Sequence, residues 1–399
     1  MLVIVMFRDA SLHSAFSAVS LMVVTLSALA TAWWLGPSEF GRLAAFQALY
    51  SMLGPLVALR LDTRVAACKT EGDLVDVLGA TCTSALLFVL IGGVIAVALS
   101  AVLDLRLSLM GLALAALGCV VDAFVAGHAF LGHTRRVITS RALRQILPSG
   151  LALLAVTLTP DYRAAAAGGL LGMLVCLPLS LNQLQGNMRP SLSRLRRTLG
   201  QHAQGLSASM SLGLLNTVWL NGLMPAMNWL GLSQVAGQFA LVQRLMGAPL
   251  GVVALGLNAM LIKAGDSWHL ARERIAKLAA GLFALAAVVA LCIDWVLHGQ
   301  QVVPVPGHWV LDRSLYVAAV FFLCSSFAVG SLSIISIRQS DEWFLAAWQL
   351  VAVLTWALAL VFLPSAAAFQ AMLSLGGLAY WVLVWRWVIV SRRLVRAQT

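Results

Sequence analysis

The sequence predicts an all-α polytopic membrane protein, with twelve transmembrane helices in two six-helix bundles. Three observations predict this fold class: an apolar composition, a regular series of long apolar stretches, and one segment that occurs twice. Of the 399 residues, 61% are hydrophobic and 10% are charged, whereas a soluble domain carries about 25% charged residues. A chain of this composition has too little polar surface for a water-soluble fold.

Apolar stretches long enough to cross a membrane recur along the whole chain. About 20 apolar residues span the roughly 30 Å hydrocarbon core of a bilayer. Two boundaries are weak, because only a short turn separates the fifth stretch from the sixth and the eleventh from the twelfth. The predicted spans are 14–35, 43–61, 78–100, 107–131, 143–159, 163–181, 207–230, 235–262, 275–297, 314–337, 343–363 and 365–390.

The distribution of basic residues supports twelve spans. With the amino terminus in the cytoplasm, the cytoplasmic segments hold 21 lysines and arginines, and the opposite face holds four. Cytoplasmic loops carry such an excess, and a missed span would have mixed the two groups. We therefore expect both termini in the cytoplasm. The net charge of +11 reflects topology and contact with membrane lipids, and we expect no nucleic acid as a partner.

One segment of the chain occurs twice, about half a chain apart. WLGPSEFGRLAAFQAL begins at Trp34, and WLGLSQVAGQFALVQRL begins at Trp229. An offset of six spans preserves orientation, so the halves would be parallel repeats related by a pseudo-twofold axis, with a central cavity between them. The alternative is chance similarity between Leu/Ala/Gly stretches. The repeat predicts an N-terminal bundle at 1–185, a cytoplasmic basic linker at 186–206 and a C-terminal bundle at 207–399.

Ionisable side chains inside predicted spans are costly and usually functional. Arg244 lies deep in the eighth span, and Asn258 lies about 40° from it on the helical wheel. We interpret both as candidate substrate-binding residues. Asp122 is the one carboxylate well inside a span. It is an ion-coupling candidate, or equally a structural ion-pair partner of Arg244.

Polar side chains form stripes along three spans that the repeat relates. In the first span the stripe begins at His13, a second ion-coupling candidate. The second span carries Gln47 and Tyr50, and the seventh carries Asn221 and Asn228. We interpret these residues as the lining of a substrate cavity. The alternative is hydrogen bonding between packed helices.

Three basic residues lie at the cytoplasmic ends of the second and eighth spans: Arg60, Arg64 and Lys263. They are either orientation anchors or a rim that captures a phosphate group, for which the planar guanidinium fork is suited. The chain has no metal-binding motif, no nucleotide-binding loop and no large external loop with paired carboxylates. We therefore expect no enzyme activity, no catalytic residues, no metal and no cofactor.

Two regions of the sequence resemble a known family. The run WLGPSEFGRLAAFQALYSMLGPLVALRLDTRVAACKTEGD is similar to the loop and second span of bacterial polysaccharide-biosynthesis membrane proteins. The run VAGQFALVQRLMGAPLGVV is similar to their eighth span. These proteins are the O-antigen and exopolysaccharide repeat-unit flippases of the multidrug/oligosaccharidyl-lipid/polysaccharide exporter superfamily.

The resemblance implies a function. An undecaprenyl-diphosphate-linked oligosaccharide would cross the bacterial inner membrane by alternating access, for O-antigen, capsule or exopolysaccharide synthesis. Arg244, Arg60, Arg64 and Lys263 would contact the diphosphate and acidic sugars, and other polysaccharide assembly proteins would be partners. The first alternative is a small-molecule or drug exporter of the same superfamily, although the first span lacks the acidic ion site of related drug exporters. The second alternative is a membrane glycan transferase or polymerase.

Overall fold

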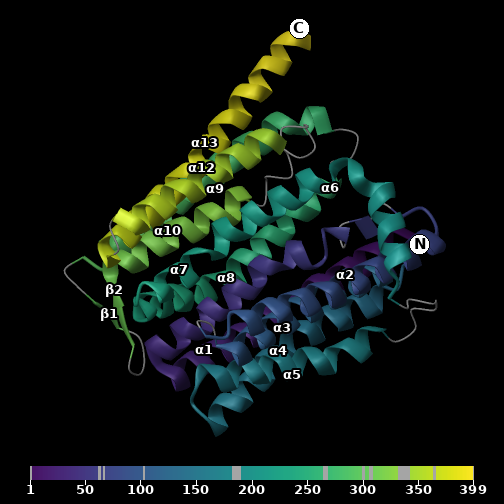
Figure 1. Cartoon of the computed structure of the whole chain (residues 1–399). Coiled ribbons are helices and arrows are strands. Elements are labelled where there is room, and N and C mark those ends of the chain that lie inside the picture. The colour runs from purple at the N-terminus through teal and green to yellow at the C-terminus, as the bar shows by residue number, and fades with distance from the viewer. Residues whose placement is uncertain are drawn as a thin grey trace. The chain divides into compact units, whose positions relative to one another are not determined.

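The computed structural model of the chain is almost entirely helical (Figure 1). The backbone is described at residues 2–61, 64–65, 68–101, 104–181, 190–263, 268–298, 302–304, 309–330, 342–362 and 365–398. Within these ranges, side chains are not described at residues 2–18, 134, 202–209, 248–249, 251–276, 278–279, 283, 286, 302–304, 328–330, 342–343 and 387–398.

The chain divides into two contact units. The N-terminal unit holds residues 1–35 and 39–228, and the C-terminal unit holds residues 36–38 and 229–399. This division follows contacts between residues. The predicted linker at 186–206 rests instead on where the apolar spans begin and end. The contact units therefore do not test the predicted bundle boundaries, which stay a prediction.

The N-terminal unit is a layered packing of long helices. Its helix α3 packs against α2, α4 and α5, while α4 packs closely along α5, and α6 packs against α2 (Figure 1). The α2–α3–α6 contact is an apolar cluster that includes Leu78, Phe124 and Leu195. The helices are α1 Leu2–Val57, α2 Glu71–Ala98, α3 Leu105–Phe130, α4 Thr134–Leu158, α5 Tyr162–Leu181, α6 Leu192–Asn221 and α7 Leu223–Trp229.

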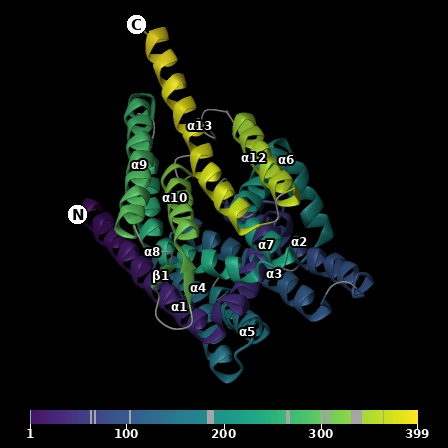
Figure 2. The same cartoon turned by 90° about the vertical axis from the view of Figure 1, so that its left-hand side faces the viewer.

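The C-terminal unit is centred on α10, which packs against α8, α9 and α13 (Figure 2). A short antiparallel hairpin, which the apolar pattern did not predict, precedes α10 and pairs Val303 with Leu311. Phe239, Phe322 and Phe369 from three helices form an aromatic core. The elements are α8 Ser233–Lys263, α9 Trp268–Val296, β1 Val302–Pro304, β2 Val310–Asp312, α10 Arg313–Gly330, α12 Glu342–Phe362 and α13 Ala366–Gln398.

A helix overlaps each of the twelve predicted spans, once α1 is divided at Gly36, where the backbone leaves helical geometry. Residues 331–337 of the tenth predicted span lie outside the described residues. The chain is therefore an all-α polytopic membrane protein, as predicted. The pseudo-twofold axis and the central cavity stay predictions. Among the described residues, six helices are long and apolar enough to cross a membrane: Val19–Val57, Glu71–Ala98, Leu105–Phe130, Tyr162–Leu181, Phe344–Phe362 and Ala366–Arg386.

The two copies of the repeated segment share an unusual backbone conformation. Gly36 has a φ of 71° and Gly231 has a φ of 78°, so both have the positive φ that glycine tolerates best. After one inserted residue in the second copy, burial also agrees at several matched positions, although Leu35 is buried and its counterpart Leu230 is exposed. Gly41 and Ala44 are buried, as are their counterparts Gly237 and Ala240, whereas Leu49 and Leu245 are exposed in both copies. This agreement in conformation and burial supports a true repeat over chance similarity.

Replacing either repeat glycine by alanine should destabilise the protein. We expect Gly36→Ala and Gly231→Ala each to lower the free energy of unfolding by about 1–3 kcal/mol, because a backbone with positive φ is strained for an L-residue by about that much. No atom lies within 4 Å of the added Cβ at either position, so the loss would report backbone conformation alone. Chemical unfolding of the full chain in detergent measures it.

Gly150→Ala is the matched control for this experiment. Its Cβ also meets nothing within 4 Å, but Gly150 lies inside α4 without a positive φ. Alanine is the better helix former there, so the control should stabilise by about 0.5–1 kcal/mol. An equal effect of all three substitutions would contradict the conformational explanation.

Candidate functional site

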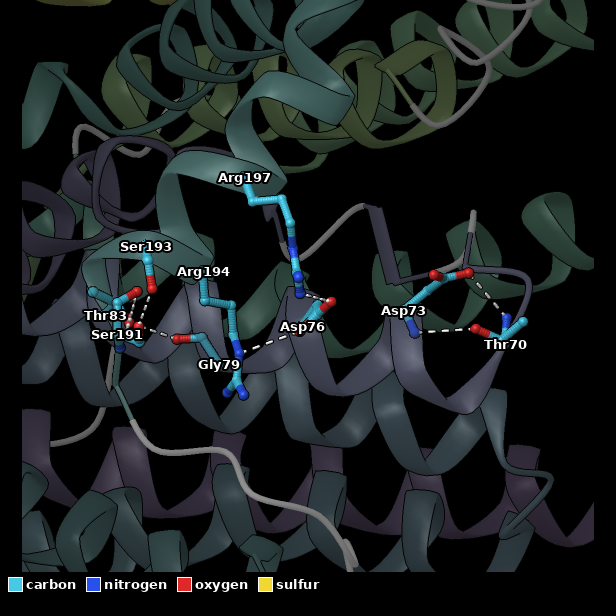
Figure 3. Close-up of polar contacts among 9 residues, drawn as sticks. All are labelled: Thr70, Asp73, Asp76, Gly79, Thr83, Ser191, Ser193, Arg194 and Arg197. Atoms are coloured by element: carbon cyan, nitrogen blue, oxygen red, sulfur yellow. Dashed lines mark hydrogen bonds and ion pairs between the residues drawn. The ribbon is translucent and has the colours of Figure 1, made fainter.

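A group of charged side chains joins α2 to the first turns of α6 (Figure 3). Asp76 on α2 forms an ion pair with Arg194 of α6, whose Nε atom lies 3.2 Å away, and a second ion pair with Arg197 of α6. Asp76 and Arg194 are mostly buried, with 27% and 21% of their side chains exposed, whereas Arg197 is 59% exposed. We call these three residues the α2–α6 clasp.

The face of α2 below Asp76 is shaped to receive α6. Gly79 lies beneath the Arg194 side chain, and a Cβ there would lie 2.5 Å from Arg194 Nη1. Thr83 lies one helical turn further along the same face and accepts a hydrogen bond from the backbone N–H of Ser191, at 2.9 Å. Asp76, Gly79 and Thr83 thus form one docking surface, because residues three and four apart share a helix face.

The clasp also offsets an excess of positive charge at the start of α6. The positive end of the helix dipole lies there, yet the first turns of α6 carry Arg194, Arg196 and Arg197 and no acidic residue in the first turn. Asp76 supplies the missing negative charge from a neighbouring helix. The arrangement fixes the orientation of α6 and leaves Arg197 partly accessible to an external anion.

Arg60 lies in a strained turn that follows α1. Leu59 and Arg60 have φ angles of 48° and 56°, a conformation that is rare for residues other than glycine and often marks functional sites. Leu59 and the buried Leu61 pack against the apolar core, and this packing holds the turn. The turn brings the Arg60 side chain against α6, where a Cβ at Gly213 would lie 3.2 Å from Arg60 Nε.

Arg64 lies just beyond the same turn and is half-buried. Its Nε atom is buried and has no hydrogen-bond partner in the described part of the chain. A buried donor without a partner is costly, and an anionic ligand would satisfy it. Arg60 and Arg64, both predicted from sequence, therefore flank one turn at the predicted cytoplasmic end of the second span.

Asp122 on α3 forms an ion pair with Arg144 on α4. A counter-charge reduces the cost of placing a carboxylate within a span. The sequence proposed Arg244 as the structural partner, but it treated Arg144 only as a cytoplasmic charge. The ion-coupling role of Asp122 stays a prediction. A proton that binds to Asp122 would have to compete with Arg144 for the carboxylate.

Several polar side chains in the spans that carry the predicted stripes bond to their own helix. Thr31, Ser51 and Asn221 bond to carbonyls four residues earlier in the chain, and in Ser51 the acceptor is the carbonyl of Gln47. Tyr50 lies against Phe46, with ring centroids 5.8 Å apart. These bonds are local to each helix and do not test the cavity lining, which stays a prediction.

The remaining candidates fall in different parts of the chain. Arg244 is half-buried on α8, in the C-terminal unit, and Asn228 is half-buried at the end of α7. The backbones of His13, Asn258 and Lys263 are helical, but their side chains lie outside the described residues. Within the described residues, no cluster of three His, Cys, Asp or Glu side chains could hold a metal ion.

In comparisons with known proteins, the chain is similar to several solved structures. No protein-family profile matches the chain, and no curated protein does. A MATE transporter in the straight conformation shares 18% identity over 98% of this chain and 96% of its own, with a TM-score of 0.41. A eukaryotic MATE transporter shares 14% identity over 96% and 94%, with a TM-score of 0.44.

A third solved structure is an inward-facing conformation of a multidrug resistance MATE family transporter of the MOP superfamily. It shares 16% identity with this chain, over 96% of this chain and 94% of its own, with a TM-score of 0.42. All three identities and TM-scores are low, so the likeness to these structures is distant.

Proposed function

We propose that the chain is a membrane transporter that works by alternating access between its two repeat-related halves. The observation that carries this proposal is the agreement of the repeat copies at Gly36 and Gly231, in conformation and in the burial pattern that follows. Parallel repeats of this kind are typical of secondary transporters, in which one half rocks against the other around a fixed site.

For the substrate, we propose an undecaprenyl-diphosphate-linked oligosaccharide that is moved across a bacterial inner membrane. Arg60 and Arg64 support a diphosphate, because they are half-buried arginines at the predicted cytoplasmic end of a span, and Arg64 has a buried donor without a partner. Guanidinium groups bind phosphate oxygens in a bidentate manner. Arg244 stays a candidate contact for the diphosphate and acidic sugars, and other polysaccharide assembly proteins would supply and accept the substrate.

A small-molecule exporter is the second candidate function. It is the better match to the description of one solved structure as a multidrug resistance transporter. The two candidates make opposite demands on the arginines, since a cationic drug gains nothing from a positively charged site. Substitution of Arg60 and Arg64 therefore distinguishes the lipid-linked substrate from a cationic drug.

The test uses the full chain reconstituted in liposomes that carry a fluorescent polyprenyl-diphosphate-linked N-acetylglucosamine. We expect the protein to accelerate movement of the probe between leaflets, read by dithionite quenching. The double variant Arg60→Gln and Arg64→Gln should slow it roughly tenfold or more, since a charge-assisted hydrogen bond contributes about 1.5–3 kcal/mol. Arg42→Gln, which removes an exposed arginine paired with Glu39, should leave the rate unchanged.

Two results would contradict the lipid-linked substrate. One is an equal rate of probe movement in the double variant and in Arg42→Gln at equal amounts of folded protein. The other is no movement of the lipid probe together with ethidium transport in the same liposomes, which would select the small-molecule exporter.

A further inference from the structure

His128 is a buried imidazole that neither the clasp nor the strained turn uses. It lies in the last turn of α3 and is 1% exposed. Its Nε2 atom lies 2.9 Å from the backbone oxygen of Ser180, which belongs to the last turn of α5. The last carbonyls of a helix have no donor within that helix. The imidazole therefore joins the ends of α3 and α5.

The hydrogen bond to Ser180 determines the tautomer of His128. A carbonyl oxygen only accepts, so Nε2 carries the proton and Nδ1 of the neutral ring carries a lone pair. Nδ1 is buried and has no hydrogen-bond partner in the described structure. A second proton at Nδ1 would thus be a buried donor with no acceptor, which is strongly unfavourable.

The two basic groups beside the ring also disfavour a second positive charge there. His133, between α3 and α4, has its ring centroid 5.8 Å from that of His128, and Arg136 on α4 acts on the ring electrostatically. From α5, the thiol of Cys176 contacts the Ser180 hydroxyl rather than the ring. On α3 itself Asp122 is paired with Arg144, and Cys82 of α2 packs in the apolar cluster.

We propose that His128 is a proton-binding site that couples proton uptake to a movement of α3 relative to α5. The geometry of this conformation fits the neutral ring, because Nδ1 has no acceptor among the described residues. A proton taken up from water at Nδ1 favours a second conformation in which the new N–H meets an acceptor or water. By linkage, a change between these conformations binds or releases a proton. As a coupling device for transport the inference rests on the proposed function, but proton binding itself does not.

The first experiment measures amide hydrogen exchange of the full chain at about pH 5.5 and about pH 8, the interval in which histidine titrates. Rates are corrected for the intrinsic pH dependence of exchange. Peptides that cover the ends of α3 and α5 should lose protection at the lower pH by roughly tenfold, which corresponds to about one unit of pKa difference between the two conformations. Peptides from α12 should not change.

Two variants assign the effect to one ring. His128→Gln keeps a donor for the Ser180 carbonyl and cannot take up a proton, so it should remain protected at both pH values. His133→Gln should retain the loss of protection at low pH. Equal exchange of the wild-type protein at the two pH values would overturn the proposal without any variant, and so would an unchanged pH response in His128→Gln.

A transport measurement separates this inference from the proposed function. In liposomes with an imposed pH gradient, the wild-type protein should transport the lipid probe faster than without the gradient, and His128→Gln should lose that acceleration. If exchange depends on His128 while no probe moves, the proton site stands and the proposed function fails. If probe movement depends on the gradient equally in both proteins, the coupling role of His128 fails and the transporter stands.

Discussion

Gly172→Ala is expected to force α4 away from α5 and to reduce sharply the amount of folded protein. A Cβ at this position would lie 2.5 Å from Cα and 2.6 Å from N of Pro148, and both are backbone atoms of α4 that cannot turn aside. Overpacking a core typically costs about 1–3 kcal/mol, and the loss here should reach or exceed the upper end. The measurement is thermal unfolding of purified protein together with the monodisperse yield in detergent.

Gly168→Ala should have a similar effect, because its Cβ would meet the backbone oxygen of Leu151. Gly169→Ala is the matched control on the same helix, since its nearest foreign atom lies 4.0 Å away, at the Pro148 oxygen. It should leave the midpoint unchanged or raise it slightly, because alanine favours the helix. The same loss in Gly169→Ala as in Gly172→Ala would show that helix propensity, not close approach, determines the result.

The close approach of α4 and α5 has a physical cause in both helices. Gly168 and Gly172 are spaced as in the small-residue motif that allows membrane helices to pack closely. Pro148 inside α4 has no N–H, so it interrupts the regular hydrogen bonding of its helix at the same place. The glycines of α5 thus allow close packing at the place where Pro148 interrupts α4.

The positions of the helices were predictable because the apolar stretches are long and the charges between them are sparse. Even the weak boundary between 143–159 and 163–181 was confirmed by a turn at which the Arg163 N–H binds the Asp161 carboxylate. The ends were less predictable. Helix α2 begins at Glu71 rather than in the apolar stretch, because Thr70 and Asp73 form a reciprocal capping box there.

The clasp could not be predicted, although each of its residues was visible. Arg197 and Asp76 are 121 positions apart, and apolar periodicity contains no information on contacts over that distance. Arg194 was counted only as a cytoplasmic charge that orients the chain. The signal that could have found the site is the lack of an acidic residue at the start of α6, since several arginines beside a helix amino terminus require a negative charge from elsewhere.

Asp76→Asn should detach the start of α6 from α2 and lower the free energy of unfolding by about 2–3 kcal/mol. Hydrogen bonds to charged groups contribute about 1.5–3 kcal/mol each, and partial exposure of the pair reduces the value expected for full burial. Chemical unfolding of the full chain in detergent measures the loss. Glu39→Gln is the control, since it breaks the exposed pair with Arg42 and should cost less than about 0.5 kcal/mol.

The two arginines of the clasp should contribute unequally. In double-mutant cycles, Arg194→Gln should couple to Asp76→Asn more strongly than Arg197→Gln does, because Arg194 is the more buried partner. Added salt should weaken the coupling of Arg197 more than that of Arg194, because exposed charges are screened more effectively. Equal coupling and equal salt dependence would show that α6 is held by apolar packing and the Thr83–Ser191 bond instead.

Gly79→Ala tests the geometry of the clasp without removing a charge. The new Cβ would lie 2.5 Å from Nη1 and 2.9 Å from Cδ of Arg194, so the flexible side chain must move and lose its contact with Asp76. The substitution should therefore destabilise the wild-type protein but cost much less once Asp76→Asn is present, because both changes remove the same interaction. Full additivity of the two changes would place the damage in the backbone packing of α2 on α6, not in the ion pair.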